Sequence, residues 1–129
     1  MNRTLRLHII LPVAPSAVYQ AITNSSSLQK WLTEMARVSL AEGVFELWGR
    51  YLPGSPDRPV TKLNEAVENR VLRFTWNYKT HALPVTLELA SSNTGTVLTV
   101  MQEVVERLPG EASFGDFWRL SLEWDMGYF

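Results

Sequence analysis

The sequence predicts an α+β fold, in which a curved antiparallel sheet of about six or seven strands surrounds a C-terminal helix and two short helices follow the first strand. Three observations lead to this prediction. Most of the chain alternates between apolar and polar residues with the period of a strand, and helical spacing occurs only near the beginning and at the end. The strand-like runs are joined by short turn signals, which is typical of an antiparallel meander. The last, apolar helix then has to lie against the sheet.

The chain opens with a predicted strand over residues 4–11, where apolar and polar side chains alternate. Pro12 ends this strand because it donates no backbone hydrogen bond. Pro15 suits the first turn of a helix, where a missing N–H costs nothing, and we expect this helix to span residues 15–23.

A second short helix should follow directly. Asn24 suits the C-terminal end of the first helix, and the serines at 25–27 offer an N-cap for the next one. In that second helix Leu28, Trp31 and Leu32 repeat at spacings of three and four residues, so they should form its buried face.

Six β-prone runs occupy the middle of the chain. They are residues 37–41, 44–50, 60–67, 71–78, 85–89 and 96–104. Glu42-Gly43 is a tight-turn signal that makes the first two runs a hairpin. We expect loops at the proline-rich residues 52–59 and at the polar residues 91–95, and we place His81 in a short turn before Pro84.

The last predicted element is a helix that starts near Phe114. Ser113 and Asp116 stand three residues apart, as in a capping box with Asp in place of Glu. The wide apolar face of this helix consists of Phe117, Trp118, Leu120, Leu122 and Trp124.

Composition restricts the function further. The chain has 129 residues, 46% of them apolar, and we expect residues 1–129 to form one domain with a substantial core. Cysteine is absent, which excludes disulfides, thiolate catalysis and thiolate-bound metals. The net charge is -1 without a dense basic run, so no nucleic-acid partner is expected. No apolar run is long enough to span a bilayer and none fits a signal peptide, so we expect no membrane partner and a cytoplasmic location.

Several short motifs resemble one known family. Residues 13–23, Val-Ala-Pro-Ser-Ala-Val-Tyr-Gln-Ala-Ile-Thr, with the later Trp31-Leu32, resemble the opening signature of START-like (SRPBCC) domains. Within these the chain is most similar to the AHSA-type branch, the homologues of the activator of heat-shock-protein ATPase. Later motifs follow in the same order, so the resemblance covers nearly the whole chain. These motifs are residues 42–46, 71–76, 94–100 and 117–118. The resemblance implies the helix-grip fold, also called birch-pollen-allergen-like.

Two departures from the branch stand out. The last helix has room for only about four turns before Phe129, whereas the family's helix usually runs further. Thr61 stands where the branch usually has a glycine, which says little about function. The large apolar residues Met126, Tyr128 and Phe129 lie close to the end of the sequence, and a homodimer, an onward stretch of chain or folding back over the sheet would each cover them.

The candidate functional feature is an aromatic interior. The chain contains five Trp, four Tyr and five Phe, and strand and helix periodicity direct several of them towards the space between the sheet and the last helix. We predict a pocket for a hydrophobic small molecule there. Its predicted lining is Phe74, Trp76, Tyr78, Leu98, Val100, Gln102, Trp118 and Leu122. The alternative is a filled core, in which Tyr78 and Gln102 bond only to backbone or water.

Residues for catalysis or metal binding are not evident. His8 and His81 do not have the spacing of metal ligands, and the strand residues Glu46, Glu65 and Glu88 are expected to face solvent. The serines suit helix caps, and the glycines form neither a nucleophile elbow nor a phosphate loop. We therefore expect no catalytic residue, no metal and no cofactor.

Three functions remain as alternatives. The first is non-catalytic binding of a small hydrophobic or aromatic molecule. The second is a polyketide cyclase or aromatase-like enzyme, because such enzymes share the superfamily that the chain resembles. The third, implied by the AHSA-type resemblance, is a co-chaperone that binds a heat-shock protein of the ninety-kilodalton class and stimulates its ATPase. Those activators carry an additional N-terminal domain, so we place chaperone binding last.

Overall fold

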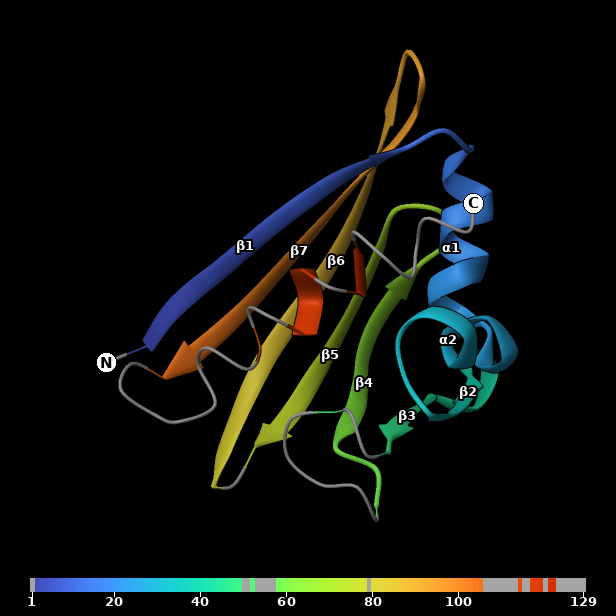
Figure 1. Cartoon of the computed structure of the whole chain (residues 1–129). Coiled ribbons are helices and arrows are strands. Elements are labelled where there is room, and N and C mark those ends of the chain that lie inside the picture. Colours follow the sequence, from blue (N-terminus) through green and yellow to red (C-terminus); the bar gives the residue numbers. More distant parts are fainter. Residues whose placement is uncertain are drawn as a thin grey trace.

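The computed structural model describes residues 2–49, 52, 58–78, 80–105, 114, 117–119 and 121–122. Figure 1 shows a long, twisted sheet with the helices α1 and α2 at one end. The elements in chain order are β1 (Asn2–Leu11), α1 (Pro15–Thr23), α2 (Ser25–Trp31), β2 (Met35–Ser39), the 3₁₀ turn η1 (Leu40–Glu42), β3 (Val44–Trp48), β4 (Thr61–Val67), β5 (Val71–Tyr78), β6 (His81–Ser92) and β7 (Gly95–Val105). Phe114 and residues 117–119 are helical, and residues 121–122 form a wider π-type turn.

The strands form two antiparallel sheets among the described residues. One has five strands in the order β1-β7-β6-β5-β4, and the other pairs β2 with β3. The expected helix-grip α+β arrangement is confirmed, but the expectation of one continuous sheet is wrong. β1 lies beside the last strand, β7, so the N-terminal strand closes the meander along its far edge.

The junction between the two sheets explains the break. The backbone N–H of Val60 donates to the carbonyl of Leu47 at 3.0 Å. Next to it the Thr61 hydroxyl donates to the carbonyl of Phe45 at 2.9 Å and accepts from the N–H of Leu47 at 3.0 Å. The Thr61 side chain therefore makes hydrogen bonds to β3 in the place where the backbones of two paired strands would bond to each other. A glycine at position 61 could not make these bonds.

We expect Thr61→Val to lower the free energy of unfolding by about 1–3 kcal/mol, because it leaves the buried Leu47 N–H and Phe45 carbonyl without their partner. The side-chain shape is nearly preserved, so packing should change little. Urea denaturation measures the loss. Thr99→Val, on the outward side of β7, is the matched control and should change stability by less than about 0.5 kcal/mol. Equal losses in the two variants would show that the Thr61 hydroxyl has no bridging role.

The two helices have the predicted positions, with one difference in capping. Asn24 follows α1 as expected, but its side-chain oxygen also accepts the Ser27 N–H at 3.0 Å, so Asn24 rather than a serine is the N-cap of α2. The Ser25 hydroxyl instead accepts the N–H of Val38 and ties α2 to β2. A single Asn can serve both helices because they meet without a linker.

β6 is longer than predicted at both ends. His81 opens the strand opposite Tyr78, so the expectation that it lies in a turn is wrong. At the other end pairing with β7 continues to Ser92, which pairs with Gly95. β6 pairs with strands on both sides. This pairing keeps polar residues at its ends in the strand, although their intrinsic propensities favour turns.

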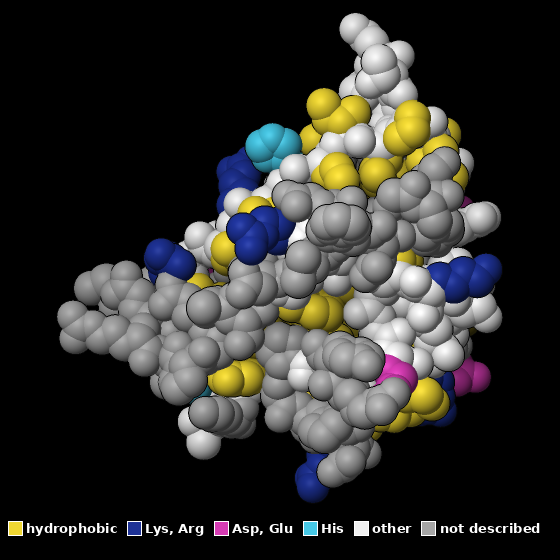
Figure 2. Space-filling view, in the orientation of Figure 1, with side chains coloured by type: hydrophobic (Ala, Val, Ile, Leu, Met, Phe, Trp, Pro, Cys, Tyr) yellow, Lys and Arg dark blue, Asp and Glu magenta, His cyan; other side chains and the backbone are white. Residues whose placement is uncertain are grey.

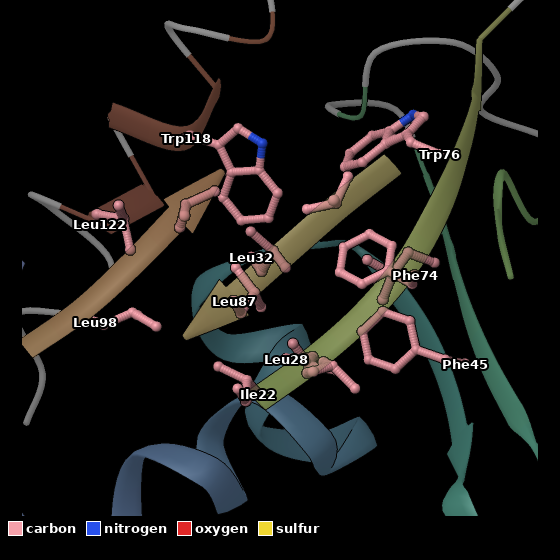
Figure 3. Close-up of a cluster of buried hydrophobic side chains, with 14 of the residues drawn as sticks. Ile22, Leu28, Leu32, Phe45, Phe74, Trp76, Leu87, Leu98, Trp118 and Leu122 are labelled. Atoms are coloured by element: carbon pink, nitrogen blue, oxygen red, sulfur yellow. The ribbon is translucent and has the colours of Figure 1, made fainter. Parts of the chain in front are cut away.

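The buried side chains form one core cluster that joins both sheets, α1, α2 and the C-terminal helical residues. Figure 3 shows that Trp118 and Leu122 lie opposite Phe74 and Trp76 of β5, with Leu87 of β6 between the two groups. The prediction that the C-terminal helical residues cover the sheet is confirmed for those the structure describes. Trp124, most of residues 52–59 and the apolar chain end at 126–129 lie outside the described residues.

Candidate functional site

All of the predicted lining residues are buried in the core. They are Phe74, Trp76 and Tyr78 in β5, Leu98, Val100 and Gln102 in β7, and Trp118 and Leu122 in the C-terminal helical residues. β6 separates β5 from β7 and contributes Val85 and Leu87 to the same face, which the sequence analysis did not include. Val85 and Leu87 alternate with polar neighbours in the sequence, and this pattern could have added them to the predicted lining.

Trp76 is the centre of the aromatic packing. Its ring centroid lies 5.1 Å from that of Phe114, 5.4 Å from that of Phe117 and 6.2 Å from that of Trp118, all in edge-to-face geometry. Edge-to-face pairs place the positive rim of one ring against the negative face of another, which adds to the gain from burial. Trp76 therefore fixes the C-terminal helical residues to β5.

The ring packing extends in both directions from Trp76. The ring centroid of Phe74 lies 6.5 Å from that of Trp76. The ring centroid of Phe45 of β3 lies 4.8 Å from that of Phe74. On the other side of Trp76, the ring centroids of Phe114 and Tyr78 lie 5.2 Å apart. Phe45 and Phe114 were not predicted as site residues, because which segment covers β5 depends on the tertiary fold.

One polar pair lies inside this apolar core. The indole N–H of Trp118 donates to the side-chain oxygen of Gln102 at 2.7 Å. Gln102 is 1% exposed and Trp118 is 0% exposed. In the strand ladder Gln102 stands between Leu5 of β1 and Val85 of β6, so its neighbours on both sides are apolar.

The nitrogen end of the Gln102 amide is also buried. Among the residues that the structure describes, the buried side-chain nitrogen Nε2 makes no hydrogen bond. An indole nitrogen can only donate, which requires the amide oxygen of Gln102 to face Trp118 and leaves both Nε2–H groups directed elsewhere. A buried donor without a partner costs about 1–3 kcal/mol, and a hydrogen-bond acceptor placed next to this nitrogen would remove that cost.

The charged side chains of the described residues lie outside this core. Apart from the tyrosines and tryptophans, the polar residues among the described buried positions are Thr33, Thr61, Thr96, Gln102 and Ser121, and none of these is ionisable. In the strand hairpins, Glu46 pairs with Arg37 and Glu65 pairs with Arg73 at the surface, and Glu88 is exposed as predicted. On the face shown in Figure 2 the basic side chains are scattered and form no dense patch among the residues drawn in colour.

Other chemistry is not apparent within the described ranges. There, no group of three or more His, Asp or Glu side chains converges as metal ligands would. In that same part of the chain, no helix combines the length and the apolar character needed to cross a membrane.

Tyr19 of α1 has a perturbed proton affinity. Burial, and secondarily the negative charge of Glu68, raise the pKa of the Tyr19 phenol above its ordinary value of 10.0. Above that pH the unfolded chain releases the phenol proton while the folded protein still holds it, so the free energy of unfolding should fall as pH rises through this range.

Tyr19→Phe should remove this part of the pH dependence and leave stability at neutral pH nearly unchanged. Urea denaturation of the wild type and the variant from about pH 9 to about pH 11 gives the difference directly. Glu68→Gln should remove only the smaller, electrostatic share. Parallel curves for the wild type and Tyr19→Phe would contradict the assignment.

Comparison with solved structures confirms the fold. Protein MLL2253 from Mesorhizobium loti is 22% identical and has a TM-score of 0.74, with 94% of this chain and 92% of that chain covered. CalU16 from Micromonospora echinospora is 20% identical, with a TM-score of 0.73 and coverage of 98% and 73%. The Aha1 dimer from Colwellia psychrerythraea is 20% identical, with a TM-score of 0.70 and coverage of 95% and 90%. At these identities the likeness shows the fold alone.

Sequence comparison places the chain in a family. No curated protein matches it. The family described as Activator of Hsp90 ATPase homolog 1-like protein matches residues 12–124, which is nearly the span over which the START-like resemblance was seen. With the buried sheet face, the covering C-terminal helical residues and this match, the chain belongs to the AHSA-type branch of the START-like proteins, the Activator of Hsp90 ATPase homolog 1-like family.

Proposed function

We propose that this protein binds a small hydrophobic or aromatic molecule, without chemically changing it, between β5–β7 and the C-terminal helical residues. The observation that carries the proposal is the Gln102 amide nitrogen, which is buried among aromatic and aliphatic side chains and has no partner within the described residues. Natural cores rarely leave such a donor unused, and a bound molecule would use it.

The surrounding side chains suit an apolar guest. Trp76, Trp118 and Tyr78 offer ring faces and edges, and Leu98 and Val100 of β7 offer aliphatic surface. Pockets for small molecules combine such apolar walls with a few placed polar groups. Gln102 supplies the polar group here, at the centre of β7.

The binding role is favoured over an enzymatic one by the kind of polar groups present. Proton transfer near neutral pH needs a carboxylate, an imidazole or a comparable group next to the reacting atom. The buried side chains at the predicted lining positions contribute amide, indole and phenol groups instead. A cyclase-like role would require a reactive group from outside the described residues.

The test is a titration of the whole chain with α-methylstyrene, an uncharged aromatic hydrocarbon, followed by calorimetry and by ¹H–¹⁵N NMR. We expect saturable binding of one molecule per chain, with shifts at the indole N–H of Trp118. Val100→Phe should fill the interior and weaken binding at least tenfold, although overpacking also costs about 1–3 kcal/mol of stability.

Val97→Phe is the matched control, because Val97 lies on the opposite face of the same strand, between Ile10 and Ala90. It should leave the affinity unchanged. Equal loss in the two variants, or no saturable binding of either this probe or an aromatic ketone of the same size, would contradict the proposed function.

Two macromolecular partners stay as proposals. The family description names activation of the Hsp90 ATPase, and the Colwellia structure is a dimer, so a chaperone and a second copy of this chain are both candidates. Light scattering at micromolar concentration tests the homodimer, and a monomer mass throughout would contradict it. Stimulation of a chaperone's ATPase by the purified chain tests the other, and an unchanged rate would contradict it.

A further inference from the structure

We infer that the bound molecule carries an uncharged carbonyl group, which accepts a hydrogen bond from the Gln102 side-chain nitrogen. This inference rests on the proposed function and names the ligand class for the same site. It depends on three properties of the Gln102–Trp118 pair: a fixed amide orientation, an apolar environment and the absence of a compensating charge among the described residues.

The orientation of the amide is fixed by Trp118. A glutamine amide can turn by half a revolution and exchange its oxygen and nitrogen, but the Trp118 indole offers only an N–H. The 2.7 Å bond between Trp118 Nε1 and Gln102 Oε1 therefore holds the oxygen, and Nε2 becomes a donor of constant direction. A site with a fixed donor distinguishes acceptors from donors among its ligands.

The environment makes that distinction strong. The flanking residues in the sheet are Leu5 and Val85, and Val100 and Val104 are the inward neighbours along β7. None of these side chains can accept a hydrogen bond. A ligand of the same shape without an acceptor would leave Nε2 without a hydrogen bond. An acceptor in the ligand should therefore add the free energy of one buried hydrogen bond to the binding free energy.

The charge balance selects a neutral acceptor over an anionic one. Described buried positions include no Lys, Arg or His that could offset a carboxylate. Burial of an unpaired charge costs far more than one hydrogen bond from an amide returns. A ketone or similar carbonyl also brings no donor of its own that would need a partner in this core.

Three probes of nearly equal size separate these possibilities: acetophenone, α-methylstyrene, in which a carbon replaces the carbonyl oxygen, and benzoate. We expect acetophenone to bind about tenfold more tightly than α-methylstyrene, the ratio that one buried hydrogen bond of this kind gives. Benzoate should bind most weakly at neutral pH. In ¹H–¹⁵N spectra one Gln102 side-chain N–H signal should move downfield with acetophenone and not with α-methylstyrene.

Two variants and one control complete the test. Gln102→Leu should abolish the preference for acetophenone while α-methylstyrene still binds. Trp118→Phe removes the bond that holds the amide, so the preference should shrink because the oxygen can then face the ligand. Gln29→Leu makes the same change at an exposed position of α2 and should preserve the preference.

The outcomes are distinguishable. If none of the probes binds the wild type, the proposed function fails and this inference with it. If acetophenone and α-methylstyrene bind equally and the Gln102 signals stay in place, the interior binds ligands but the inference is overturned. The wild-type spectra decide the matter even if Gln102→Leu does not fold.

Discussion

Replacing Trp76 by Ala should lower the free energy of unfolding by about 3–5 kcal/mol, the range for loss of a large aromatic side chain from a packed core. Trp76 is 0% exposed and its ring contacts those of Phe74, Phe114, Phe117 and Trp118. Its removal would take away the packing that holds the C-terminal helical residues to β5. Urea denaturation followed by circular dichroism measures the loss.

The size of this loss also describes the surroundings of the ring. Trp48→Ala is the control, because Trp48 of β3 is only half-buried and should cost distinctly less. A loss below about 1 kcal/mol for Trp76→Ala would contradict the conclusion that these ring contacts hold the C-terminal helical residues to β5.

Gly95→Ala should be at least as damaging to the fold, with a loss of about 3 kcal/mol or more. Gly95 opens β7 with a φ of 148°, and a Cβ there would lie 2.0 Å from the carbonyl oxygen of Leu11. The obstacle is backbone of β1, which cannot turn away as a side chain could. The variant should therefore separate the ends of β1 and β7, which thermal unfolding and loss of amide protection in these strands would detect.

Gly43→Ala is the matched control for Gly95→Ala. Gly43 also has a positive φ, 71°, but a Cβ there would meet nothing within 4 Å. It should cost about 1 kcal/mol, from backbone strain alone. Similar losses in the two variants would show that the close approach of β1 and β7 does not limit the choice of residue at position 95.

Local elements could be predicted well because their signals are local. Pro15 begins α1, which has its predicted range, and β3 begins after Gly43 as predicted. The strand predicted over 37–41 instead spans Met35–Ser39, because Leu40–Glu42 form a 3₁₀ turn. Alternation along 71–78 places Phe74, Trp76 and Tyr78 inward, as the structure confirms. Period-two patterning is reliable where one face of a strand is buried.

The relations between elements could not be predicted in the same way. That Thr61 joins two sheets depends on how closely β3 and β4 approach, which no spacing in the sequence encodes. The sequence directs Gln102 and Trp118 to the same interior, but their bond depends on how the last helix is seated on β7. The functional hypothesis therefore became specific only once the tertiary structure was known.

Intermolecular nuclear Overhauser effects can locate bound acetophenone and so show whether the interior binds a small apolar carbonyl compound. We expect effects from the acetophenone protons to the indole ring of Trp118, the methyl groups of Val100 and the side-chain amide of Gln102. The contradicting result is contact only with exposed apolar side chains such as Ile10 and Val67, which are 61% and 39% exposed, or no intermolecular effect at saturating acetophenone.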